Sequence, residues 1–187
     1  MKRILSLLVF IAILSLLVGC TEQSIDEKEK APKVSLEEIA TQIKEQIAED
    51  MKANGAGEDV LVDGNLQSYI ETDLKESEED DPAVAILLEK MQLNKEEFNS
   101  GIVIAAMMNV NSDEIILLEA SDEAHVDKLK ESLERELEAQ THTWEQYLPD
   151  QYEKVKKNII TTKGNYLLYV TYEHPEKIKE VFNQNFE

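Results

Sequence analysis

The chain has 187 residues, with 39 acidic and 19 basic side chains and a formal net charge of −20. This charge argues against a nucleic-acid-binding protein, because phosphate contacts need clustered lysine and arginine. The single cysteine, Cys20, excludes an intrachain disulfide. The length is sufficient for one domain with one hydrophobic core.

The N-terminal segment has the features of a signal peptide. Lys2 and Arg3 are followed by an apolar run over residues 4–18, and Gly19 supplies a small residue before Cys20. The stretch Leu17-Val18-Gly19-Cys20 resembles the lipobox of bacterial lipoproteins. The resemblance implies cleavage after residue 19, attachment of fatty-acid (palmitate) chains through a diacylglycerol on Cys20, and a location on the outer face of the cell membrane.

Three other interpretations of this segment remain open. It could be an ordinary secretory signal with a cysteine near the cleavage point, or an uncleaved membrane anchor. This run is 15 residues long, shorter than the roughly 20 that a spanning helix needs. The third alternative, a buried structural cysteine, fits poorly with the polar residues that follow Cys20.

Removal of residues 1–19 would leave a chain with a formal charge of −22, since Lys2 and Arg3 are lost. We expect residues 20–34 to be the acylated cysteine and a flexible linker, and residues 35–187 to be a single domain. The 13 residues 21–33 would give the linker a reach of about 20 Å.

The domain is predicted to begin with a helix. Ser35 and Glu38 have the spacing of a capping box, and Asn54-Gly55 ends the segment. Apolar residues recur at three- and four-residue steps between these points: Leu36, Ile39, Ile43, Ile47 and Met51. The pattern over residues 57–81 is weak, and it predicts a short helix or a docked loop after a turn at residues 63–65.

Pro82 is expected to open a second short helix. Two β-hairpins then flank a long helix that begins near Ser121 or Asp122. The predicted strands cover residues 102–108, 115–118, 159–163 and 166–172, and a last helix starts at Pro175. The order ββαββα predicts an α+β domain, with N-terminal helices and an antiparallel sheet of about four strands on which helices pack.

No catalytic or metal-binding motif is present. The three histidines have no metal-ligand spacing, the segment around Asp63 lacks the oxygen ligands of a calcium loop, and no nucleophile elbow occurs. We therefore assign no catalytic residue, no metal and no cofactor. The acidic run at residues 76–81 is either a solvated loop or a loop that binds a cation or a basic partner.

Five residues are candidates for a recognition surface. Methionine and tyrosine are favoured at interfaces, and they occur here at a hairpin turn and after the long helix. The alternative is that these side chains close the core. The candidates are Met108, Asn109, Glu114, Tyr147 and Tyr152.

The same segments carry a resemblance to a known family. Met108-Asn109-Val110, Asp113-Glu114-Ile115, Tyr147-Leu148-Pro149 with Tyr152, and Gly164-Asn165-Tyr166 are similar to an uncharacterised lipoprotein family of low-GC Gram-positive bacteria, catalogued as a domain of unknown function. The similarity covers residues 35–182, with residues 76–82 as an insertion. It implies membrane attachment and brings no activity with it.

We therefore expect a lipid-anchored, non-enzymatic domain that binds a protein partner in the cell envelope and no nucleic acid. Two alternatives remain. One is a hydrolase with residues that meet only in the fold, such as His142 or Ser100 with a carboxylate. The other is a low-affinity calcium-binding protein.

Overall fold

The computed structural model describes residues 34–75 and 81–187. The predicted signal peptide, Cys20 and almost all of the predicted linker lie outside the described residues, as does most of the acidic run, residues 76–80. In the described part, no helix is long and apolar enough to span a membrane.

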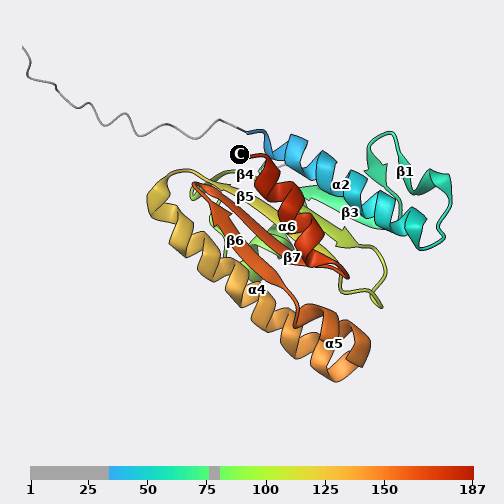
Figure 1. Cartoon of the computed structure of the whole chain (residues 1–187). Coiled ribbons are helices and arrows are strands. Elements are labelled where there is room, and N and C mark those ends of the chain that lie inside the picture. The colour runs from blue at the N-terminus through green and yellow to red at the C-terminus, as the bar shows by residue number, and fades with distance from the viewer. Residues whose placement is uncertain (1–33, 76–80) are drawn as a thin grey trace, which may run out of the picture. The chain divides into compact units, whose positions relative to one another are not determined.

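A five-stranded antiparallel sheet forms the centre of the domain, with the strand order β3-β4-β5-β7-β6 (Figure 1). The strands are β3 (Tyr69–Asp73), β4 (Phe98–Ala106), β5 (Glu114–Ala120), β6 (Ile159–Lys163) and β7 (Tyr166–Thr171). A separate two-stranded hairpin consists of β1 (Leu61–Val62) and β2 (Asn65–Leu66), after the short turn η1 (Glu58–Val60). The predicted α+β class and antiparallel sheet are confirmed.

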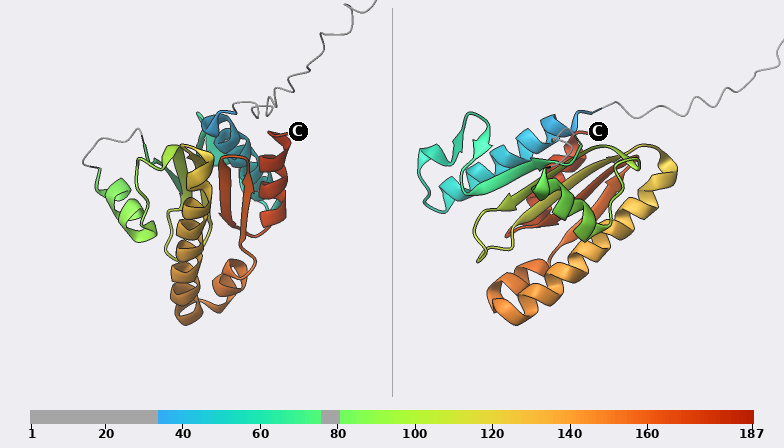
Figure 2. Two further views of the ribbon diagram at one scale, coloured as in Figure 1. Left: turned by 90° about the vertical axis from the view of Figure 1, so that its left-hand side faces the viewer. Right: turned by 180° about the vertical axis from the view of Figure 1, so that it is seen from behind.

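Helices cover both faces of the sheet (Figure 2). One face packs against α2 (Leu36–Ala53) and α6 (Pro175–Gln184), and the other against α3 (Pro82–Met91) and α4 (Val126–Tyr147). The short turn η2 (Glu123–His125) precedes α4, and α5 (Pro149–Val155) follows it. Since β5 and β7 lie between two helical layers, their apolar residues are buried on both faces.

The two layers have separate cores. The core under α2 and α6 contains every second residue of the central strands, among them Ile104, Ile115 and Val170. Their sequence neighbours Val103, Ile116 and Tyr169 pack under α3 and α4. Successive side chains of a strand point to opposite faces of the sheet. Since helices cover both faces here, each side chain enters one of the two cores.

Local sequence signals account for most element ends. Gly164 has φ +55° and forms with Asn165 the two-residue turn that joins Lys163 to Tyr166, as predicted for this hairpin. Asp122 accepts hydrogen bonds from the backbone of Ala124 and His125 at η2. Ser35 is the N-cap of α2, but its hydroxyl bonds Glu37 and makes no side-chain cap bond, so the capping-box geometry is absent.

The predicted turn at residues 63–65 is confirmed between β1 and β2, whereas the predicted short helix or docked loop after it was wrong. Residues expected to form a short helix or loop form the β1–β2 hairpin and the edge strand β3, which raises the sheet from about four strands to five. Three of the five residues of β3 are polar, and Ile70 is half exposed. A strand at the edge of a sheet needs little apolar surface, so its sequence carries a weak signal.

Candidate functional site

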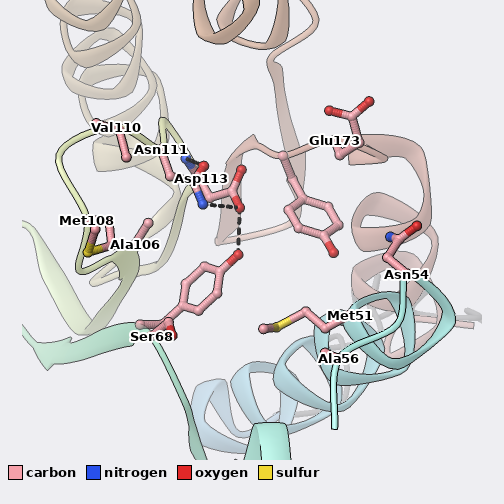
Figure 3. A pocket seen from close by; sticks show the side chains of 12 residues that line it. Met51, Asn54, Ala56, Ser68, Ala106, Met108, Val110, Asn111, Asp113 and Glu173 are labelled. Atoms are coloured by element: carbon pink, nitrogen blue, oxygen red, sulfur yellow. Dashed lines mark hydrogen bonds between the residues drawn. The ribbon is translucent and has the colours of Figure 1, made fainter.

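A pocket lies at the end of the sheet, on the face that α2 and α6 cover (Figure 3). Its volume is about 500 Å³, within the range of small-ligand sites. Met51, Asn54 and Ala56 line it from the C-terminal end of α2, and Ala106 and Met108 line it from the end of β4 and the loop beyond. Figure 3 shows these two groups on opposite sides of the opening.

Asp113 organises the wall on the loop side. Its Oδ2 accepts hydrogen bonds from the Tyr69 hydroxyl at 2.5 Å and from Asn111 Nδ2 at 3.0 Å. Its Oδ1 lies 2.6 Å from Lys154 Nζ, which also donates to Asn111 Oδ1 at 2.9 Å. Asp113 and Lys154 are both largely buried. Lys154 therefore balances the charge of the carboxylate inside the wall, and both carboxylate oxygens accept hydrogen bonds. These bonds hold β3, the β4–β5 loop and α5 together.

Local geometry places Asp113 at this point. Its backbone N–H donates to Asn111 Oδ1 at 3.1 Å, an Asx turn that precedes β5. The neighbouring Ser112 N–H donates to Gln151 Oε1 of α5 at 2.9 Å. Pro149 at the first position of α5 sets the start of this short helix and thereby the position of Lys154.

The wall on the helix side is built around Tyr172 and Asp50. The Tyr172 hydroxyl donates to Asp50 Oδ2 at 3.4 Å, and Lys177 Nζ lies 2.6 Å from Asp50 Oδ1. Asp50 comes from α2 and Lys177 from α6. The ion pair therefore joins the two helices that cover this face beside the pocket.

The two tyrosines are hydrogen-bond donors that do not ionise near neutral pH. The pKa of Tyr69 is raised mainly by burial and, second, by the negative charge of Asp113. Burial, and next the negative charge of Asp50, raises the pKa of Tyr172. Both phenols therefore stay neutral, and they can orient a bound group but not act as bases at physiological pH.

The rim of the pocket is apolar and exposed. Met108 and Val110 are 60% and 46% exposed, and Met107 beside them is 60% exposed. Among the described residues that line the pocket, Asp113 and Glu173 are acidic and none is basic. Since Lys154 balances the charge of Asp113, the acidic character of the lining comes from Glu173. A cavity with apolar walls, a fixed polar side and one such carboxylate can hold an apolar group that carries a positive charge.

The structure brings only some of the predicted recognition residues to this site. Met108 lines the pocket, and Asn109 is exposed in the same loop. Tyr147 is exposed at the end of α4, with its ring 5.7 Å from that of Trp144, and Tyr152 is half-buried in α5 under Lys156. Glu114 is buried beneath α4, on the opposite face of the sheet, so it does not share a surface with Met108.

Ser100 and His142, the candidates for a hydrolase site, do not line the pocket. Ser100 Oγ donates to Glu119 Oε2 at 3.1 Å, and His142 lies beside Gln146 on the exposed side of α4. Within residues 34–75 and 81–187, no group of three or more His, Cys, Asp or Glu side chains could hold a metal ion. Asp81, the described end of the acidic run, caps α3 by accepting from Ala83 N–H at 2.8 Å.

No sequence pattern predicted Tyr69, Asp113, Lys154 and Tyr172 as site residues. Tyr69 and Lys154 lie 44 and 41 residues from Asp113, and no local pattern links them. A partial signal existed in Asn111-Ser112-Asp113, a run of turn-forming residues at the end of an apolar strand.

The comparison with known families gives one match. The family described as Domain of unknown function (DUF4358) matches residues 71–172, more than half of the chain. The matched segment runs from β3 past the end of β7 and includes Asp113, Lys154 and Tyr172, whereas α2 and α6 lie outside it. No curated protein and no solved structure matches the chain. The chain belongs to the DUF4358 family of domains of unknown function.

Proposed function

We propose that this protein is a lipid-anchored binding domain on the outer face of the cell membrane of a low-GC Gram-positive bacterium. The support for the anchor is the order of features at the N-terminus: Lys2 and Arg3, the apolar run over residues 4–18, Gly19 and Cys20. Two acyl chains on Cys20 would suffice for stable membrane attachment.

The pocket between α2 and the β4–β5 loop is the binding site in this proposal. The observation that carries it is the combination of a fixed wall around Asp113 with exposed apolar side chains at the rim. Exposed apolar side chains that gather around a groove commonly mark a site where a partner or ligand binds. Met108 and Val110 are such side chains, and they line the mouth of the pocket.

The partner is a protein segment with apolar and basic residues. An apolar side chain of the partner would enter the pocket between Met51 and Met108, and a basic group would lie near Glu173. The formal charge of −22 that remains after removal of residues 1–19 would attract a basic partner and speed its association. Binding is favoured over catalysis because Tyr69 and Tyr172 stay neutral and Asp113 is paired with Lys154.

The anchor is tested by fractionation of cells that express the wild type and Cys20→Ser. The serine variant should move to the soluble fraction or the medium, since it lacks the thiol that is acylated. Membrane retention of Cys20→Ser equal to the wild type would contradict the anchor.

The pocket is tested by site-specific photocrosslinking in cells. A photoreactive side chain at Met108 should give a defined crosslinked band, whereas one at Ile86 should not. Ile86 is a matched control, because it is 64% exposed but lies on α3, on the other face of the sheet. The same band from both positions, or none from Met108, would contradict a binding site at the pocket.

A further inference from the structure

A second polar cluster lies beneath α4, on the opposite face of the sheet from the pocket. Glu114 of β5 and Glu136 of α4 are 7% and 1% exposed. Lys90 of α3 lies near both, with its Nζ 2.5 Å from Glu136 Oε1 and 4.0 Å from Glu114 Oε1. Two buried carboxyl groups therefore share one ammonium group.

With both carboxylates ionised, this cluster would carry a net charge of −1 in a desolvated interface. Such a charge costs several kcal/mol when it has no counter-ion. The other titratable group that faces Glu114 is the hydroxyl of Tyr169 on β7, and burial, and next the negative charge of Glu114, raises its pKa. A single bound proton would balance the charge of Lys90, Glu114 and Glu136.

The hydrogen bonds indicate which carboxyl group holds the proton. Glu136 Oε1 is bonded by Lys90 and by Gln140 Nε2 at 2.7 Å. Gln140 is held in this orientation because its Oε1 accepts from Trp144 Nε1 at 2.8 Å. Glu136 Oε1 therefore accepts two hydrogen bonds, one of them from a cation, whereas Glu114 lies 4.0 Å from Lys90 and is bonded by the uncharged hydroxyl of Tyr169.

The remaining oxygen atoms support one shared proton, whichever carboxyl group carries it. Among the described residues, Glu114 Oε2 and Glu136 Oε2 are buried without a hydrogen-bond partner. Buried polar atoms are rarely left unpaired. A proton on one carboxyl group creates one donor and leaves one acceptor, so one shared hydrogen bond satisfies both atoms.

We infer that Glu114 and Glu136 form a buried proton-binding site, in which Glu114 carries a proton at neutral pH and donates it in a hydrogen bond to Glu136. This site is separate from the proposed pocket and does not depend on it. Burial, and next the negative charge of Glu136, raises the pKa of Glu114 to about 8. When the proton leaves, two facing anions remain with one Lys90, and the packing of α4 on the sheet is weakened.

The test is a pH titration of the full chain in detergent micelles, followed by NMR of ¹³C-labelled glutamate carboxyl carbons. The signals of the pair are assigned by their loss in Glu114→Gln and Glu136→Gln. In the wild type, the Glu114 carboxyl carbon should titrate with a midpoint above pH 7. Midpoints below pH 5.5 for both carboxyl groups would overturn the proposal.

Three variants test which neighbouring groups raise the titration midpoint of Glu114. Glu136→Gln should lower the Glu114 midpoint by at least about one pH unit, a tenfold weaker affinity for the proton, because the repelling charge is gone and Lys90 remains. Lys90→Met should raise it, because the stabilising cation is lost. Glu131→Gln, on the exposed side of α4, should leave it unchanged. A Glu114 midpoint that is the same in all three variants would contradict a site shared by Glu114, Glu136 and Lys90.

Discussion

Asp113 and Glu114 are consecutive residues whose carboxyl groups lie on opposite faces of the sheet. Asp113 joins Tyr69 and Lys154 beside the pocket, whereas Glu114 joins Glu136 and Lys90 beneath α4. The alternation of a β-strand separates them. These two residues therefore contribute to two buried networks. In the first, Lys154 balances the charge of Asp113; in the second, Lys90 alone faces two carboxyl groups.

Asp113→Asn should destabilise the protein by about 3–5 kcal/mol, because it leaves the largely buried Lys154 without its counter-ion. The free energy of unfolding is measured by urea denaturation. The double variant Asp113→Asn/Lys154→Met should recover part of the loss, since it removes the unpaired charge. Glu153→Gln, which breaks the exposed pair with Lys156, is the control and should cost less than about 1 kcal/mol. Equal losses from Asp113→Asn and Glu153→Gln would show that Asp113 does not hold the wall together.

Tyr69→Phe should cost about 1.5–3 kcal/mol, the range for a hydrogen bond to a charged group, because Asp113 Oδ2 loses one of its two donors. The ring remains, so the apolar packing is kept. Tyr147→Phe serves as the control, because Tyr147 is half exposed, and it should change stability by less than about 0.5 kcal/mol. The measurement is urea denaturation of both variants under the same conditions. A decrease in unfolding free energy for Tyr69→Phe no larger than for Tyr147→Phe would refute the prediction.

The stability of the wild type should decrease between pH 5.5 and pH 8.5. Glu114 has its pKa raised from 4.5 to about 8 in the folded state, so the folded protein binds this proton more tightly than the unfolded chain. The stabilisation is complete below pH 4.5 and is lost as the pH rises through about 8. The slope is about 1 kcal/mol per pH unit within this window.

Glu114→Gln should remove this slope, because an amide cannot titrate. The comparison is made by urea denaturation of both proteins at several pH values. Parallel curves for the wild type and Glu114→Gln would mean that another group causes the pH dependence.

Gly101→Ala should destabilise the protein by about 1–3 kcal/mol. An added Cβ would lie 3.0 Å from Leu118 Cδ2 and 3.2 Å from Leu74 Cδ1, both in the buried layer under α3 and α4. Thermal unfolding measures the effect, and a companion variant that also shortens Leu74 to valine should recover part of it. An unchanged melting temperature for Gly101→Ala would show that this layer has room for a methyl group.

The strongest sequence patterns predicted the elements that bury a regular apolar face. Ile39, Ile43 and Ile47 recur at helical spacing and are fully buried in α2, and the Gly164-Asn165 turn marked the hairpin of β6 and β7. The edge strand β3 was missed because Glu71 and Asp73 give it a polar character. An edge strand is stabilised by backbone pairing on one side, and backbone pairing leaves little trace in side-chain types.

The pocket could not be predicted in the same way. Its two walls depend on contacts between Asp113 and residues 44 and 41 positions away, and between Asp50 and residues 122 and 127 positions away. Such pairs arise only after the strand order and the helix layers are set. Glu114 was placed on the same surface as Met108 because they are close in sequence, but the pleat of the strand turns its side chain to the other face.

The position of the pocket at the C-terminal end of α2 has a practical consequence. With 18 residues, α2 is about 27 Å long, so the N-terminal junction of the domain and the pocket lie at opposite ends of this helix. A dye, an affinity handle or a solid support attached at Ser35 would therefore lie at the end of α2 that is far from the opening. Immobilisation through Ser35 leaves Met108 and Glu173 at the other end of this helix for ligand screens.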